Sequence, residues 1–292
     1  MKYIALAFSD LHLSDTPYLC RSGEPDWMGY QRGLLRSILK IASRKQCPIV
    51  FAGDFFDRWK VSPALLNLSM RELMTGVHVY GIPGQHDLPE HRYTGLQETS
   101  FGSLVNAGMI SCPPSGVMIG DYAVDFLPFG SEPSEWETPP DIVVLHDLVL
   151  KEDLQKNKKN LGRFRKKFKG SKLLICGDNH EGFYCKSPKP GYPDILNCGS
   201  SLRKTADQKD YQPKVYLITD RLRVEAVPLN ISNEVFSTEH LKKNQKKFLA
   251  EAMQVVTAAA DMDYPANLKK QMDAEKTPGF IRGIVTGVLN DC

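Results

Sequence analysis

The sequence predicts an α/β protein, and three observations support this fold class. Apolar runs of strand length alternate with segments of helical periodicity over residues 3–82, which is typical of a parallel sheet covered by helices. Strand after strand ends in a cluster of polar side chains, so these clusters should collect at one edge of a sheet. From about residue 107, short strands with turn signals indicate further, partly antiparallel sheet structure.

The first half shows the strand and helix alternation most clearly. Residues 29–45 place Leu and Ile at helical spacing, with Arg and Lys on the remaining faces. The next helix starts near Ser62, which can cap it, has Pro63 in its first turn and ends before Gly76. The strands expected around these helices span residues 3–8, 50–52 and 77–82.

The second half is predicted to supply a second sheet. Residues 116–120 and 122–127, divided by Gly120-Asp121, predict an antiparallel hairpin. The other strands expected there span residues 142–145, 172–176, 195–196, 215–219 and 222–227. Together with the first half, this gives a predicted domain over residues 1–230.

The C-terminal segment, residues 231–292, has a purely helical pattern. Two apolar stripes run from Phe248 to Val256 and from Phe280 to Leu289, with Tyr264-Pro265 and Thr277-Pro278-Gly279 between them. We expect the stripes to pack on the larger domain. A reduced cap and a partner-binding helix are the alternatives.

Composition is that of an ordinary globular protein. With 292 residues, 42% hydrophobic and 24% charged, the chain can bury a sizeable core, and its net charge of +3 does not by itself indicate nucleic-acid binding. The seven cysteines lack Cys-x-x-Cys spacing, which favours reduced thiols. There is no signal-peptide pattern and no run of about 20 apolar residues, so we expect a cytoplasmic protein without a membrane partner.

Five predicted strands end in residues that can bind metal ions. A lone Asp-x-His or Gly-Asp is a weak signal, but five such clusters at strand ends form a strong one. The clusters are Asp10-Leu11-His12, Gly53-Asp54-Phe55-Phe56-Asp57, Gly84-Gln85-His86-Asp87, His146, and Gly177-Asp178-Asn179-His180.

In this order the clusters resemble the motifs of the calcineurin-like metallophosphoesterases, over roughly residues 1 to 230. The resemblance implies a four-layer fold, in which two packed mixed sheets are flanked by helices, with a C-terminal helical appendage. The closest likeness is to SbcD-type DNA nuclease subunits, particularly phage-encoded ones. It rests on the first two clusters and on Asn197-Cys198-Gly199-Ser200 with Arg203.

The resemblance also implies a function and a role for each residue. It implies a dinuclear metal-dependent phosphodiesterase, specifically a DNA exonuclease in DNA repair with an SbcC-type ATPase partner; a homodimer is left open. Asp87 is positioned in sequence to orient the imidazole of His86. By resemblance, Asp54 bridges two cations. One cation site is completed by Asp10, His12 and His180, and the other by Gln85, His146 and Asp178. By the same resemblance, His86 stabilises the transition state or protonates the leaving oxygen.

Two residues depart from the family pattern, and both belong to the second site. Gln85 replaces asparagine and Asp178 replaces histidine, so this site is richer in oxygen donors. Oxygen donors favour manganese, or else magnesium. The four negative charges of three aspartates and a hydroxide cancel the four positive charges of two divalent cations. The centre should therefore attract phosphate weakly unless nearby basic residues compensate.

A basic run from Lys156 to Lys172 could provide this compensation. It is either a solvated face or a surface that contacts DNA phosphates. The residues predicted to contact DNA are Arg163, Arg165, Lys166, Lys167 and Lys169. The rival functions are a phosphoesterase for nucleotides or other small phosphorylated metabolites, and a catalytically inactive scaffold on the same fold.

Overall fold

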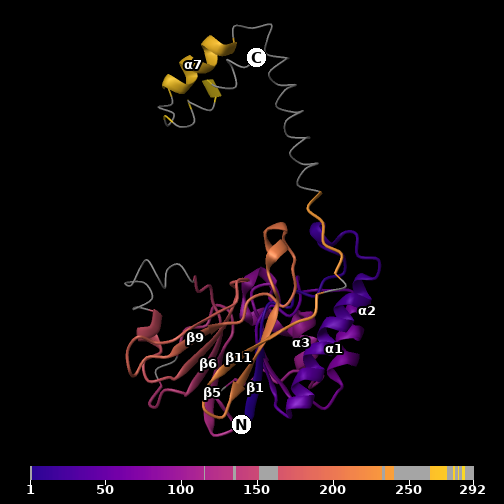
Figure 1. Ribbon diagram of the computed structural model, residues 1–292, viewed down its shortest axis with the longest axis vertical. Helices are drawn as coiled ribbons and strands as arrows, with labels where there is room; N and C mark the ends of the chain where they lie inside the picture. The colour runs from indigo at the N-terminus through magenta and orange to yellow at the C-terminus, as the bar shows by residue number, and fades with distance from the viewer. Residues whose placement is uncertain are drawn as a thin grey trace. The chain divides into compact units, whose positions relative to one another are not determined.

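The computed structural model describes residues 2–114, 116–133, 136–150, 164–231, 234–239 and 264–274, with single residues at 279, 282, 285 and 286. The chain divides into two compact units, Met1–Ser237 and Thr238–Cys292. The first unit contains two β-sheets and their covering helices (Figure 1). It therefore holds all five strand-end clusters.

The first sheet has five strands in the order β11-β10-β1-β2-β3. The pairs β1–β2 and β2–β3 are parallel, whereas β10 pairs antiparallel with β1 and with β11. The prediction that the last two strands belong to the second sheet was wrong, because β10 satisfies the free edge of β1 instead. The strands are β1 (Tyr3–Phe8), β2 (Ile49–Ala52), β3 (Val79–Ile82), β10 (Lys214–Thr219) and β11 (Val224–Pro228).

The second sheet has six strands in the order β4-β5-β6-β7-β9-β8. The predicted hairpin is confirmed as β4–β5, and β5, β6, β7 and β9 then run parallel to one another. The three-residue edge strand β8 was not predicted. The strands are β4 (Val117–Ile119), β5 (Tyr122–Leu127), β6 (Ile142–His146), β7 (Leu173–Gly177), β8 (Phe183–Cys185) and β9 (Asp194–Asn197).

Two capped helices pack on the first sheet. The N-cap carboxylate of Asp26 accepts the N–H of Gly29 at the start of α1 (Trp27–Lys45), and the Ser62 hydroxyl accepts that of Leu65 in α2 (Pro63–Leu73). The shorter helices are α3 (Ser100–Asn106) and the 3-10 segments Leu19–Arg21, Pro89–His91, Tyr93–Glu98 and Ala206–Asp210.

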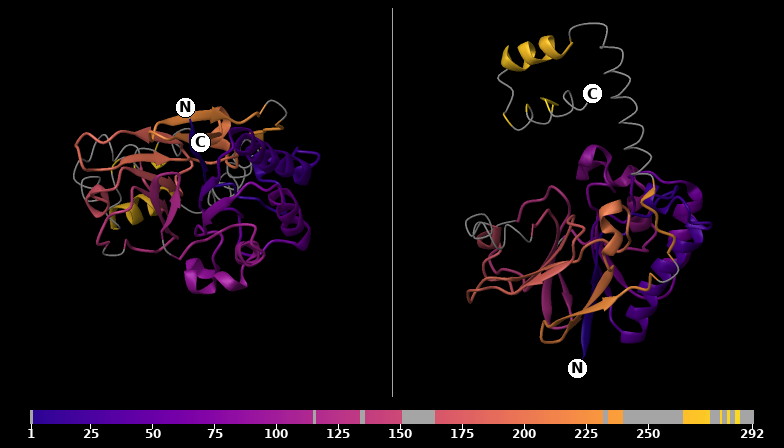
Figure 2. Two further views of the ribbon diagram at one scale, coloured as in Figure 1. Left: turned by 90° about the horizontal axis from the view of Figure 1, so that it is seen from below. Right: turned by 45° about the horizontal axis from the view of Figure 1, so that its top comes forward.

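The alternation along β2 shows why the fold is layered. Ile49 and Phe51 point into the core shared with α1 and α2, whereas Val50 and Ala52 point into a second core shared with β6 and β7 of the other sheet. A third core covers the outer face of the second sheet. Figure 2 shows the indigo helices and the magenta strands on opposite sides of β1. The two-sheet α/β fold implied by the resemblance is confirmed.

The second unit contains helix α7 (Tyr264–Ala274). The pair Tyr264-Pro265, predicted to lie between two helical stripes, occupies the first two positions of this helix, where proline is tolerated because a backbone N–H there has no helical partner. The stripe from Phe248 to Val256 and most of that from Phe280 to Leu289 lie outside the described residues. Among the described residues, no helix has both the length and the apolar character to cross a membrane.

Candidate metal centre

The strand-end clusters meet between the two sheets, at the carboxyl ends of β1, β2, β3, β6 and β7. The segments after β1 and β2 run side by side, because Asp10 N–H donates to the Gly53 carbonyl (2.9 Å) and His12 N–H to that of Asp54 (3.0 Å). The Asp178 N–H in turn donates to the carboxylate of Asp10 (3.2 Å). Backbone hydrogen bonds thus hold clusters that are far apart in the sequence at one place.

Four of the candidate ligands have an unusual backbone conformation. The φ angle is 49° at Asp10, 45° at His12, 59° at Asp54 and 76° at Asp178. These angles lie in the left-handed region that residues other than glycine rarely adopt. Such backbone strain is concentrated at functional sites, where the surrounding structure maintains it. Among the described residues, four of the eight non-glycine residues with positive φ are thus candidate metal ligands.

Four side-chain atoms surround the first candidate cation position. His12 Nε2 lies 3.6 Å from Asp10 Oδ1, 3.7 Å from Asp54 Oδ2 and 3.1 Å from His180 Nε2, and His180 Nε2 lies 3.7 Å from Asp10 Oδ1. Ligands about 2.1 Å from one ion lie roughly 3.0 to 3.5 Å from each other. Three of the four distances exceed this range by 0.1 to 0.2 Å, so the atoms are spaced slightly more widely than around a bound divalent cation.

The second position shares an atom with the first. Asp54 Oδ2 also lies 3.5 Å from His146 Nε2. Because the opposite ring nitrogen, Nδ1, contacts the Ala52 carbonyl at 2.6 Å, it must carry the proton, which leaves the Nε2 lone pair directed at the centre. A Cβ atom at Gly53 would lie only 2.2 Å from His146 Nδ1, so the glycine before Asp54 makes room for this ring.

Several buried atoms at the centre have no hydrogen-bond partner within the described structure. They are Asp10 Oδ1, Asp54 Oδ2, Gln85 Oε1 and His146 Nε2. A buried polar atom without a partner costs about 1 to 3 kcal/mol, and here all four are of a type that can bind a metal ion. The donor set therefore fits two cations that share Asp54.

The charges at the centre are strongly coupled. Burial lowers the pKa of His146, but the hydrogen bond to Asp54 and the charges of Asp54 and Asp10 outweigh this and raise it to about 10. The pKa of Asp54 is lowered, because the opposing effect of burial is exceeded by its hydrogen bond to and charge interaction with His146. Without metal, a proton on His146 thus balances the carboxylates, and binding of a cation would release it.

Gln85 and Asp178 interact with each other. The amide nitrogen of Gln85 donates to Asp178 Oδ1 at 2.5 Å, which leaves Oε1 of Gln85 as the free acceptor. Among the described residues, the three groups of acidic and imidazole ligand atoms close enough to share an ion do not include Asp178. The structure therefore places Asp178 beside Gln85, and its role as a ligand stays a prediction.

The structure corrects the role expected for Asp87. Its fully buried carboxylate accepts the N–H groups of Phe55 (3.0 Å), Phe56 (2.9 Å) and Gly84 (3.1 Å), so it joins the loops after β2 and β3. His86 Nδ1 instead contacts the Asp57 carbonyl at 2.9 Å. Burial and the charge of Asp54 raise the pKa of Asp87 to about 7, although the three N–H groups oppose this.

Sequence reasoning gave no role to two residues of the centre, Asp57, which belongs to the second cluster, and Lys204, which belongs to none. Asp57 Oδ1 lies 3.5 Å from His12 Nδ1, and Lys204 Nζ lies 3.2 Å from His12 Nε2 and 3.7 Å from Asp57 Oδ1. Burial lowers the pKa of Lys204, while Asp57, Asp54 and Asp10 oppose this. The neighbouring Arg203, quoted for its family likeness, pairs with Glu234 instead. No spacing in the sequence distinguishes Lys204, because the fold brings it to the site.

The basic run is only partly available to a ligand. Arg163 lies outside the described residues. Arg165 is 4% exposed and donates to the carbonyls of Cys185 (3.4 Å) and Lys186 (3.3 Å), which does not favour a DNA contact; that role stays a prediction. Lys167 pairs with Glu132, whereas Lys166 and Lys169 are exposed.

The chain is similar in sequence to a known enzyme family. The family model of the calcineurin-like phosphoesterases matches residues 5–182, a range that contains all five strand-end clusters. Among solved structures, a dimetal phosphatase from Danio rerio is 14% identical and covers 77% of this chain and 98% of its own, with a TM-score of 0.45. No curated protein matches the chain.

Asp54→Asn should remove metal from both positions, because Asp54 Oδ2 faces both sets of ligands. We expect elemental analysis to show loss of both ions, and manganese no longer to raise the melting temperature. The control is His78→Ala, since His78 is exposed and bonds to Ser111. Retention of both ions by Asp54→Asn would contradict the shared ligand.

Asp87→Ala should destabilise the fold, because it leaves three buried N–H groups without an acceptor. We expect the free energy of unfolding to fall by about 3 kcal/mol or more, measured by urea denaturation. Asp210→Ala removes an exposed carboxylate and should change it little. Equal stability of the two variants would show that Asp87 does not hold the loops.

Proposed function

Since the chain belongs to the calcineurin-like phosphoesterase family, we propose that this metal-dependent phosphoesterase cleaves the phosphodiester bonds of DNA. The proposal extends to an exonuclease subunit of an SbcD/SbcC-type complex, using manganese. The proposed binding partner of the unit Thr238–Cys292 is an ATPase subunit or a second copy of the chain.

The proposed centre divides its work between cations and side chains. The residues described above would hold two divalent cations, which when bound would supply an activated water and relieve the negative charge of the phosphoryl group. His86 is the candidate proton donor. The Asp57 carbonyl fixes Nδ1 of His86, and Nε2 of His86 lies 4.0 Å from Asp54 Oδ2. The His86 side chain is 37% exposed, so a substrate can reach it.

The observation that carries the preference for diesters is the number of carboxylates. Asp10, Asp54 and Asp178 all lie in or beside the centre, whether or not Asp178 binds a cation. A phosphate monoester carries up to two negative charges at neutral pH, whereas a diester carries one. The acidic surroundings therefore oppose a monoester more strongly than a diester.

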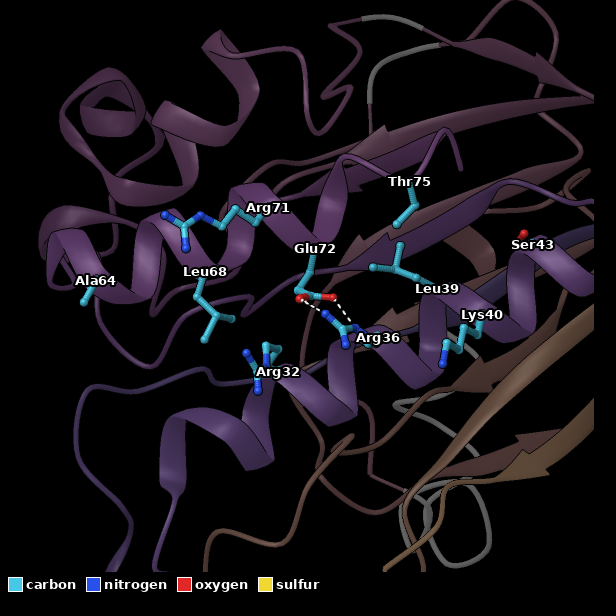
Figure 3. Close-up of a pocket in the computed structure, with 10 residues that line it drawn as sticks. All are labelled: Arg32, Arg36, Leu39, Lys40, Ser43, Ala64, Leu68, Arg71, Glu72 and Thr75. Carbon is cyan, nitrogen blue, oxygen red and sulfur yellow. Dashed lines mark hydrogen bonds and ion pairs between the residues drawn. The ribbon is translucent and has the colours of Figure 1, made fainter.

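A basic groove between α1 and α2 supports a polyanionic substrate. The cavity measures about 680 Å³ and includes four basic side chains, Arg32, Arg36, Lys40 and Arg71, against one acidic residue, Glu72 (Figure 3). Arg36 is neutralised by two hydrogen bonds to Glu72, of 2.6 and 2.8 Å. The exposed charges of the other three suit contact with a phosphate backbone.

A different cavity favours the rival function. It measures about 450 Å³ beside Asp178 and His180 and is also lined by Thr205, Asp207 and Tyr211. A cavity of this size next to the proposed ligands suits a nucleotide or a similar small phosphorylated metabolite. The inactive scaffold is disfavoured, because every ligand position offers oxygen or nitrogen.

The substrate class can be tested with manganese-loaded protein on DNA, mononucleotides and a chromogenic diester. We expect cleavage of DNA and of the diester, and none in a chelator. Arg32→Glu with Arg71→Glu should weaken DNA binding and flatten its dependence on salt, while hydrolysis of the small diester is kept.

The matched control for this variant reverses two exposed charges elsewhere, Lys189→Glu with Arg221→Glu. The control changes the net charge of the protein by the same amount. Any difference in DNA binding between the two variants therefore depends on where the reversed charges lie. Preference for mononucleotides over DNA would place the small-molecule function first.

His86→Ala should lower turnover without loss of metal, because the backbone N–H that donates to Asp54 at 2.9 Å is kept, whereas the ring Nε2 that is lost lies 4.0 Å from that carboxylate. Steady-state kinetics and elemental analysis on the same preparation measure both effects. If the ions are lost together with activity, His86 is a ligand rather than a proton donor.

A further inference from the structure

We propose that Lys204 is a phosphate-binding residue of the metal centre. Its ammonium group would contact a phosphoryl oxygen of the substrate and supply the positive charge that the acidic ligand set lacks. This inference rests on the proposed function only in requiring a phosphate ester as substrate, and it does not depend on DNA.

The position of the side chain is the first argument. Lys204 Nζ lies 3.2 Å from His12 Nε2, 3.7 Å from Asp57 Oδ1 and 6.0 Å from the centre of the Tyr18 ring. The side chain is 11% exposed, whereas lysines normally extend their ammonium groups into water. This lysine is instead directed at the centre.

The loop that carries Lys204 is bonded to the strand end that carries Asp10. Ser201 N–H donates to the Asp10 carbonyl (3.1 Å), and the Ser201 hydroxyl donates to the Ser9 carbonyl (2.8 Å). Lys204 N–H donates to the Gln208 side chain (2.8 Å). The backbone that carries the Lys204 side chain is thus fixed before substrate binds, which is what a charge-stabilising group requires of its support.

The charge of the centre is the second argument. Three carboxylates and a hydroxide cancel two divalent cations, so the metals alone attract a phosphate weakly. The basic run from Lys156 to Lys172 was the predicted compensation, but Arg165 is buried and Lys167 is paired. Asp57 is a fourth carboxylate of the centre, so without Lys204 the sum would be one negative charge. Lys204, 3.7 Å from Asp57, offsets that charge, so that a phosphate is not repelled.

A second arrangement is compatible with the same contact and must be separated from the proposal. Because Lys204 Nζ touches His12 Nε2, the ammonium group could stand in the place of the first cation. In that case, removing the lysine would increase metal binding. If Lys204 binds phosphate, removing it leaves the metal content unchanged.

The test uses manganese-loaded full-length protein and inorganic phosphate as the probe. Lys204→Met keeps an unbranched side chain that is one atom shorter and has no charge, and Lys204→Arg keeps the charge. Lys209→Met, five positions along the same loop and exposed, is the matched control. Isothermal titration calorimetry gives phosphate affinity, elemental analysis gives metal content, and thermal unfolding checks the fold.

We expect Lys204→Met to bind phosphate about tenfold more weakly or worse, as for loss of one charge-assisted hydrogen bond, with unchanged metal content. Lys204→Arg should recover most of the affinity and Lys209→Met should lose none. Unchanged phosphate affinity in Lys204→Met, or a gain of metal, would overturn the proposal. If phosphate binding weakens but no variant cleaves DNA, the proposed substrate fails and the role of Lys204 stands.

Discussion

The carboxylate of Asp54 is the interaction on which the rest of the centre depends. Its Oδ1 accepts the N–H of His86, while its Oδ2 faces both His12 and His146. These contacts link the ends of β1, β2, β3 and β6, which belong to both sheets. The layered fold therefore positions one carboxylate between two groups of ligands, and the chemistry of the site follows from that placement.

Local sequence patterns were sufficient to predict most elements. An apolar run such as Tyr3–Phe8 can be recognised from its own residues, and so can the cap and proline that begin α2. Sheet membership is not local. Nothing within β10 indicates that it pairs with β1, and β8 is too short to show a pattern. Pairing is decided by which strand edges are left open when the chain folds.

In the candidate site, too, some features could be predicted from local sequence and others depend on distant contacts. Asp10, His12, Asp54 and His146 could be predicted because parallel strands bring their carboxyl ends together. Individual roles depend on contacts that sequence does not reveal. Asp87 holds backbone N–H groups, Arg165 is buried against carbonyls, and Lys204 reaches the centre from a distant loop. Each outcome is set by burial and by hydrogen-bond partners far along the chain.

The centre also joins two halves of the chain, since Asp10 and Asp54 come from the first sheet and His146 from the second. Cations that bind only the folded state add their binding free energy to the stability of that state. Ions held between the sheets would resist the separation of the two layers as well as serve chemistry. The lifetime of the protein in a cell would then follow the local supply of the metal, so that scarcity reduces its abundance as well as its activity.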